Sequence, residues 1–179
     1  MKIVSLLPSA TEILFAIGAG PDVVGITHEC DFPPEAQRLP AVTSSALPHA
    51  AAPGAIDRHV RRSLHSGSSL YHLDAERLAR IEPDLIVTQE LCKVCAVSYE
   101  IVERAARWLS SDPRVVSLEP SSLEDVYANI ETLGKLCGRQ QGAHDLLTAL
   151  RARHERLLVN RPRPCRSAAF CCSNGPTRQ

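Results

Sequence analysis

The first twelve residues constrain the fold of this chain more than any other segment. Lys2 to Leu7 form a short apolar run of strand length, and Pro8 ends it because proline cannot donate to a sheet ladder. A helical pattern follows, and Ser9 with Glu12 has the spacing of a capping box at its start. In open α/β folds, ligands bind at the edge where parallel strands end and helices begin. We therefore expect a ligand-binding α/β lobe.

The same order of strand and helix recurs along the chain. The clearest strand is the β-branched run 84–88, which directly follows a helical pattern that begins at Asp74 and is ended by Pro83. Strands that alternate with helices indicate an α/β fold, here a Rossmann-like lobe with a parallel sheet flanked by helices. The remaining expected strands are 23–26 and 115–118, and the remaining expected helices of this lobe are 56–64 and 99–109, the latter capped by Ser98.

A long helical pattern begins at Ser122, where Asp125 three residues later completes a second capping box. Apolar residues recur at helical spacing as far as Leu157, which predicts one helix or two collinear ones over 122–158. A continuous helix of this span would be about 55 Å long at about 1.5 Å per residue. Because that exceeds what one lobe needs for packing, we expect it to connect to another lobe.

These patterns divide the chain into three parts. We expect an N-terminal α/β ligand-binding lobe over 1–120, a long backbone helix over 121–159 and an unstructured tail without periodicity over 160–179. A second lobe that would follow the connector is expected to be missing. An unpartnered apolar face on the connector predicts association, such as a homodimer through this helix.

Charge and hydropathy exclude several classes of function. Lys plus Arg and Asp plus Glu both number 20, and aromatic residues make up 4% of the chain, so we expect no nucleic-acid partner. Pro8 and Glu12 interrupt what would be the apolar region of a signal peptide. With no stretch near the length of a membrane span, we expect a cytoplasmic protein that is not embedded in a membrane.

Three loops that follow predicted strands place chemical groups at one edge of the sheet. They offer a helix N-terminus, an imidazole, carboxylates and thiols. The candidate ligand-binding residues are Pro8, Ser9, Ala10 and Thr11 in the first loop, His28, Glu29, Cys30 and Asp31 in the second, and Gln89, Glu90, Cys92 and Cys95 in the third.

The cysteines leave a second class of function open. Cys92 and Cys95 have the CxxC spacing that suits thiolate zinc or a redox pair, with Cys30 or His28 as a further ligand. An enzyme would use Cys30 or Cys92 as nucleophile and His28 as base. Because no Gly-x-Ser-x-Gly, P-loop or Gly-x-Gly-x-x-Gly motif accompanies them, we expect a protein that is not an enzyme and holds no covalently bound cofactor. A fragment without independent activity is the third alternative.

Two aromatic residues, Trp108 and Tyr127, lie on apolar helix faces, so we expect both in the core.

Four segments together resemble one protein family. Ser5 to Glu12, His28 to Pro33, Pro83 to Gln89 and Cys92 to Ser98 are similar to segments of the cobalamin-binding, helical-backbone solute-binding proteins of ABC transporters, within the ferric-siderophore and B12-binding superfamily. The resemblance covers about residues 1 to 158. It implies two Rossmann-like lobes joined by one long helix, with the ligand clamped between them.

The resemblance also implies a ligand and a partner. The ligand would be a corrinoid such as cobalamin, or a related metal chelate, held without covalent bonds in a cleft that the three loops face. Glu100 occupies the place of a glutamate that docks on an arginine of the ABC permease in secreted members, which are periplasmic or extracellular. Since one lobe supplies roughly half of the contact area, we expect this chain to bind ligand weakly or not at all.

Overall fold

Four parallel strands form the centre of the protein in the computed structural model, which describes residues 1–45, 54, 71–89 and 99–159. The strand order is β2-β1-β5-β6, and every pairing is parallel. Their bounds are β1 Ile3–Ser5, β2 Val23–Ile26, β5 Leu85–Thr88 and β6 Arg114–Ser117.

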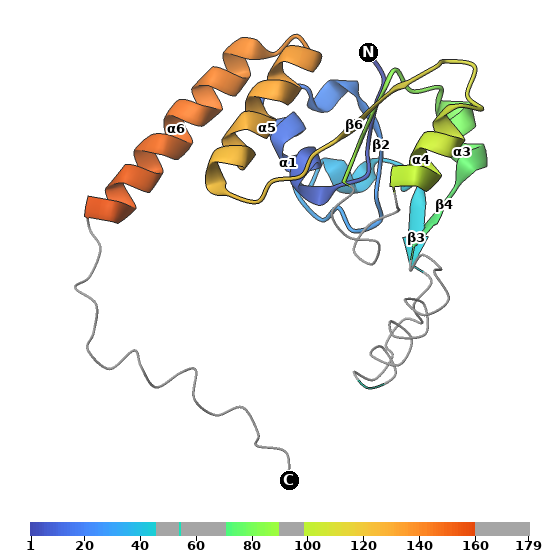
Figure 1. The fold of residues 1–179 in the computed structure, drawn as a ribbon, viewed down its shortest axis with the longest axis horizontal. Helices are drawn as coiled ribbons and strands as arrows, with labels where there is room; N and C mark the ends of the chain where they lie inside the picture. The colour runs from blue at the N-terminus through green and yellow to red at the C-terminus, as the bar shows by residue number, and fades with distance from the viewer. Residues whose placement is uncertain (46–53, 55–70, 90–98, 160–179) are drawn as a thin grey trace.

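Helices cover both faces of this sheet (Figure 1). Ile3 and Val87 point into one apolar cluster, whereas Val4 and Ile86 point into the other, because successive side chains of a strand face opposite ways. The sheet therefore has two buried faces, as parallel sheets require. The first face is covered by α1 (Pro8–Ala16), α5 (Leu123–Leu136) and α6 (Gln140–Val159), and the second by α3 (Ala75–Ile81) and α4 (Tyr99–Ala106).

A small antiparallel ribbon lies beside the main sheet. It pairs β3 (Thr43–Ser45) with β4 (Tyr71–Leu73), and an isolated parallel bridge between Ile26 and Ala41 links this region to β2. Two short 3₁₀ helices, η1 (Gly20–Asp22) and η2 (Ala36–Arg38), flank β2. The ribbon thus places a second pair of strands next to the loop that follows β2.

Most predicted elements of the lobe are confirmed, and the α/β class with a parallel sheet is correct. All four predicted strands exist within one or two residues of the expected bounds, except that β1 is shorter than 2–7. Asp74 caps α3 by accepting from the Arg77 amide at 2.9 Å, and Ser122 and Asp125 form the predicted capping box. The expected helix 56–64 and the tail 160–179 lie outside the described residues.

The capping box predicted at Ser9 is wrong. Helix α1 begins one residue earlier, at Pro8, and its N-cap is Leu7, which makes no side-chain capping bond. Proline is favoured at the first helical position because its missing N–H would have no partner there and its φ angle already suits a helix. Ser9 therefore lies inside the first turn, one residue beyond the first helical position, and is not the N-cap of α1.

The prediction of one helix or two collinear helices over 122–158 is also wrong, because two helices form but they do not share an axis. Helix α5 ends in a Schellman motif, in which the Arg139 amide donates to Gly134 O at 2.7 Å and the Gly138 amide donates to Lys135 O at 3.4 Å. Gly138 has φ +65°, a left-handed conformation that favours glycine. The chain then turns back, and α6 packs beside α5 instead of continuing its axis (Figure 1).

Glycines bring α6 into close contact with the lobe. A Cβ atom on Gly142 would lie 2.2 Å from the carbonyl oxygen of Ile17, and one on Gly134 would lie 2.5 Å from the Cβ of Ala143. Ala143 and Leu147 consequently join the same core cluster as α1 and α5. Side chains of α5 and of the first half of α6 thus pack in the core of the lobe, and the division of the chain at 120 stays a prediction.

The two aromatic residues differ in outcome. Tyr127 is half-buried and packs against the core, as expected. Trp108 is 85% exposed, so its predicted place in the core is wrong. The reason is that α4 ends at Ala106, and Trp108 lies in the turn beyond it, where the helical periodicity no longer applies.

Candidate functional site

The strand order marks the candidate site. From β1 the chain crosses to β2 on one side, whereas β5 and β6 lie on the other side of β1. Ligands of open α/β sheets bind outside the carboxyl ends of the strands at such a point of reversal. The relevant segments are therefore the turn after β1, the loop after β2 and the segment that begins at Gln89 after β5.

A group of buried polar atoms, which we call the Thr11 cluster, holds the turn after β1. It consists of Ser5, Thr11 and Cys30. Thr11 Oγ1 donates to Ser5 Oγ at 2.8 Å, and Ser5 Oγ in turn donates to Leu7 O at 3.1 Å. Because Ser5 and Thr11 are both fully buried, these bonds fix the start of α1 from beneath. The exposed surface of this turn is left to Pro8 and Ser9.

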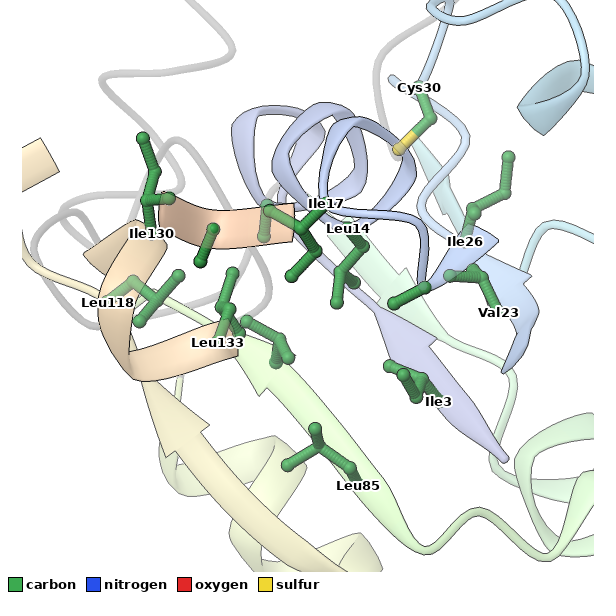
Figure 2. Close-up of a cluster of buried hydrophobic side chains, with 14 of the residues drawn as sticks. Ile3, Leu14, Ile17, Val23, Ile26, Cys30, Leu85, Leu118, Ile130 and Leu133 are labelled. Atoms are coloured by element: carbon green, nitrogen blue, oxygen red, sulfur yellow. The ribbon is translucent and has the colours of Figure 1, made fainter. Parts of the chain in front are cut away.

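Cys30 ties the loop after β2 to α1. Its sulfur lies 3.1 Å from Thr11 Oγ1 and faces the helix (Figure 2), and its side chain is only 7% exposed. Burial raises the pKa of the Cys30 thiol above its ordinary value, while the hydrogen bond with Thr11 opposes the rise. A buried thiol that stays protonated is a poor nucleophile and a poor metal ligand. The geometry favours a packing role for Cys30.

A second group, which we call the His28 cluster, joins the same loop to the β3–β4 ribbon. It consists of Thr27, His28 and Thr43. The backbone N–H of His28 donates to Thr43 Oγ1 at 3.0 Å, and His28 Nδ1 pairs with the same oxygen at 2.7 Å. Thr27 Oγ1 lies 2.8 Å from it. Tyr71 on β4 contacts the imidazole, with ring centroids 5.3 Å apart, so both the position and the plane of the ring are fixed.

The other nitrogen of the imidazole has a different environment. His28 Nε2 lies 3.2 Å from Glu29 Oε1, but within the described part of the chain it is a buried atom that makes no hydrogen bond. The Glu29 side chain is 52% exposed. The loop therefore presents a fixed imidazole with one nitrogen covered by a carboxylate that can turn towards solvent.

The predicted binding residues occupy three kinds of position. Ala10, Thr11 and Cys30 are buried and support the edge from below, and Glu90, Cys92 and Cys95 lie outside the described residues. The predicted residues with surface at the edge are Pro8, Ser9, His28, Glu29, Asp31 and Gln89. Glu100 is exposed in the first turn of α4, at the same end of the sheet.

The alternative metal centre gains no support from the geometry. Among the residues that the structure describes, no three His, Cys, Asp or Glu side chains come close enough to hold a metal ion. Because Cys92 and Cys95 are outside those residues, a CxxC site remains a prediction, with Cys30 an unfavourable third ligand.

Sequence reasoning missed four residues of this edge. Thr27, Thr43 and Tyr71 position His28, and Phe32, which is 57% exposed, adds an aromatic surface to the same loop. The exposure of Phe32 had no sequence signal, and the other contacts depend on the pairing of β3 with β4 across a long separation in sequence.

The described helices include none that is both long and apolar enough to cross a bilayer.

Comparison with known proteins gives a consistent result. The family model of the periplasmic binding proteins matches residues 3–158. An uncharacterized ABC transporter substrate-binding lipoprotein of Bacillus subtilis is 24% identical over 84% of this chain and 38% of its own length. A vitamin B12-binding protein of Vibrio cholerae is 23% identical over 90% of this chain and 48% of its own length. The chain thus spans half or less of the length of these curated relatives.

Solved structures share the fold. A possible iron-binding, periplasmic solute-binding protein of Staphylococcus epidermidis superposes with a TM-score of 0.67 at 22% identity, over 92% of this chain and 53% of the other. A periplasmic haem-binding protein of Vibrio cholerae superposes with a TM-score of 0.64 at 20% identity, over 90% of this chain and 51% of the other. At these identities the likeness establishes the fold alone.

Proposed function

This chain belongs to the periplasmic binding protein family, and we propose that it is the N-terminal ligand-binding lobe of an ABC-transporter solute-binding protein for a corrinoid or a related metal chelate. The observation that carries the proposal is the polar, partly exposed edge at the reversal between β1 and β5, since open α/β sheets in general bind ligands at such a point. The named ligands of relatives, vitamin B12 and haem, support the class of chelate.

We propose that the lobe binds its ligand without changing it. Ser9, Glu29 and Asp31 offer exposed polar groups, and Phe32 offers an apolar surface, which suits a large ligand with a polar rim. Cys30, one of the two candidate nucleophiles of the enzyme alternative, is buried with a raised pKa, and the other, Cys92, lies outside the described residues. The described edge therefore favours recognition over catalysis.

The affinity of the chain alone should be low. Association has fixed costs, so halving the contact area removes more than half of the net binding free energy. The sequence alone allows weak binding or none. With the polar edge formed in this lobe, we narrow that expectation to saturable binding with a Kd on the order of 0.1–1 mM for cobinamide or cyanocobalamin. Kd values below about 1 µM would overturn the view that a second lobe is needed for tight binding.

Titration calorimetry of the full chain, with a pair of matched variants, tests the location of the site. Ser9→Arg adds a bulky cation at the exposed start of α1, and Ser110→Arg adds the same group to an exposed serine that precedes β6, at the opposite edge of the sheet. We expect Ser9→Arg to remove detectable binding and Ser110→Arg to leave it unchanged. Equal effects of the two substitutions, or no saturable binding by the folded wild-type chain, would contradict the proposal.

We also propose an ABC permease as the protein partner, with Glu100 as a docking carboxylate. Its exposure in the first turn of α4 supports this role. Glu100→Gln should weaken capture by permease reconstituted in nanodiscs, and Glu131→Gln, an exposed carboxylate on α5, is the control. Equal capture of both variants would contradict it. The cytoplasmic location and the homodimer through the connector remain predictions.

A further inference from the structure

Two buried polar atoms at the carboxyl edge of the sheet lack hydrogen-bond partners. Within the described residues, three buried side-chain polar atoms make no hydrogen bond: His28 Nε2, Thr88 Oγ1 and Ser111 Oγ. Thr88 ends β5 and His28 follows β2, so both lie at the edge where the fold places ligands, whereas Ser111 precedes β6 at the other edge. Buried polar atoms are normally paired, so an unpaired one calls for an explanation.

The His28 ring is fixed through one nitrogen, as is usual for a histidine that ligates a metal through the other. Histidines that ligate metals use one nitrogen for the metal and fix the ring by hydrogen-bonding through the other. His28 Nδ1 pairs with Thr43 Oγ1 at 2.7 Å, and Tyr71 packs against the ring. When Nδ1–H donates to Thr43, the Thr43 hydroxyl proton is available to Thr27, and Nε2 keeps its lone pair.

A ligand can reach this buried nitrogen only if Glu29 moves away from it. The Glu29 carboxylate lies against Nε2 at 3.2 Å, and its side chain is 52% exposed, so it can rotate into solvent. Phe32, four residues after His28 on the same loop, is 57% exposed and offers an aromatic surface to a flat ligand.

We propose that His28 Nε2 ligates the metal of the bound chelate, so that the substrate class is a macrocyclic metal chelate with an exchangeable axial position. This inference rests on the proposed function and narrows it. Nε2 donates its lone pair to cobalt or iron, the axial water leaves to solvent, and no electron is transferred. A ferric hydroxamate, whose six positions are filled by the chelator, has no place for this bond and is excluded from the class.

Titration of the full chain with two forms of one corrinoid tests the proposal. Diaquocobinamide has exchangeable axial waters, whereas both axial positions of dicyanocobinamide hold cyanide. The two forms share the corrin ring and its side groups but differ by two units of charge, so the histidine variants below are needed to assign a difference in affinity to His28. We expect a shift of the visible absorption bands for the diaquo form only, as imidazole replaces water. We also expect the diaquo form to bind at least about tenfold more tightly, since it alone gains a coordinate bond.

Two histidine variants locate the effect. In His28→Asn, the amide nitrogen can replace Nδ1 as the partner of Thr43, but no atom replaces Nε2. We expect it to lose the spectral shift and the tenfold preference. His72→Asn changes an exposed histidine on β4, next to Tyr71, and we expect it to keep both. If His28→Asn does not fold, nitrogen-15 NMR of the imidazoles in the wild-type chain serves instead, with a shift of the His28 Nε2 resonance expected on binding.

The outcomes separate the two proposals. Binding of both cobinamides with equal affinity and without a spectral shift overturns the role of His28 and leaves the proposed function standing. A shift that persists in His28→Asn and disappears in His72→Asn also overturns it. No binding of either form by the folded chain overturns both the role of His28 and the proposed function.

Discussion

The Thr11 cluster and the His28 cluster hold the same loop, but they differ in redundancy. In the Thr11 cluster, Ser5 Oγ has a carbonyl acceptor of its own at Leu7, so losing Thr11 would not leave it without a partner. In the His28 cluster, the backbone N–H and Nδ1 of His28 and the hydroxyl of Thr27 all meet at one oxygen, Thr43 Oγ1.

This difference agrees with a structural role for the Thr11 cluster and with the binding role that we propose for the His28 cluster. The Thr11 cluster is fully buried and closed, as expected of a structural joint between a strand and a helix. The His28 cluster is partly exposed, depends on a single hydroxyl, and leaves Nε2 without a hydrogen bond. Residues that bind ligands commonly retain unsatisfied groups of this kind, because the ligand completes them.

The largest effect on stability is expected for Thr43→Val. The substitution conserves shape but removes the oxygen on which three groups depend, so we expect the free energy of unfolding to fall by about 2 kcal/mol. Urea denaturation measures it, with Thr132→Val as control, because Thr132 is exposed and, among the described residues, its hydroxyl bonds only to a carbonyl within its own helix. A loss no greater than that of the control would show that the His28 cluster does not depend on this hydroxyl.

Thr11→Val should have a smaller effect although Thr11 is more deeply buried. Ser5 keeps its bond to Leu7, and valine fills the same volume, so we expect a loss of about 1 kcal/mol. The same denaturation series measures it. If Thr11→Val destabilised the protein more than Thr43→Val, burial depth rather than redundancy would govern the two clusters, and the comparison would be reversed.

Local chemistry explains which elements could be predicted from the sequence. The Asp74 cap and the Ser122–Asp125 capping box are contacts between residues three apart, and the run 84–88 is a β-branched strand directly after a proline. Each of these signals is complete within a few residues, so it can be recognised without knowledge of tertiary contacts. The prediction at Ser9 failed for a local reason too, because Pro8 suits the first helical position better than Ser9 suits the cap.

The turn between α5 and α6 could not be predicted from the spacing of apolar residues. Both helices bury a face in the same core cluster, so apolar spacing continues across the break. The three glycines look alike in sequence but differ in role: Gly138 adopts a left-handed conformation, whereas Gly134 and Gly142 allow close approach of neighbouring chain segments. Only tertiary contacts distinguish these roles.

For the candidate site too, local features could be predicted from the sequence and tertiary contacts could not. His28 was identified by its place after a strand, which is a local feature. Its hydrogen bonds to Thr43 and its contact with Tyr71 require β3 to pair with β4 in a particular register. No sequence motif predicts that pairing. The sequence could therefore indicate which loop is a candidate for ligand binding, but not how its imidazole is held.

Thiol chemistry can test whether the Thr11 cluster is closed. Cys30 is 7% exposed and its pKa is raised by burial, so at pH 8 little of it is thiolate. We expect iodoacetamide to modify Cys30 at least about tenfold more slowly in the native protein than in urea, measured by peptide mass spectrometry. Modification at the same rate in both states would mean that the cluster opens readily.

The smallest effect on stability is expected for Cys137. Its thiol is partly buried without a hydrogen bond to Thr11 among the causes of its pKa shift, so a comparison with Cys30 distinguishes the effect of burial from that of the hydrogen bond. Burial is the main cause that raises the pKa of Cys137 to about 11 from 9.0; Asp22 adds to the rise and Arg139 opposes it. Since the folded pKa exceeds the unfolded one, this thiol contributes stability below pH 9 that is lost as the pH rises towards 11. Because the side chain is half-exposed, solvent screening should keep the contribution below about 1 kcal/mol.

Urea denaturation of the wild type, Cys137→Ala and Cys30→Ala at pH 8, 9.5 and 11 measures this contribution as a difference between variants, so that lysine and tyrosine ionisation cancel. Between pH 9 and 11, Cys137→Ala should lose less stability than the wild type. Cys30→Ala should show the same sign, because the pKa of Cys30 is also raised, although the hydrogen bond with Thr11 counteracts part of the rise. Parallel pH profiles for the wild type and Cys30→Ala would mean that Thr11 stabilises the Cys30 thiolate enough to offset burial, and the Thr11 cluster would then hold a reactive cysteine rather than a structural one.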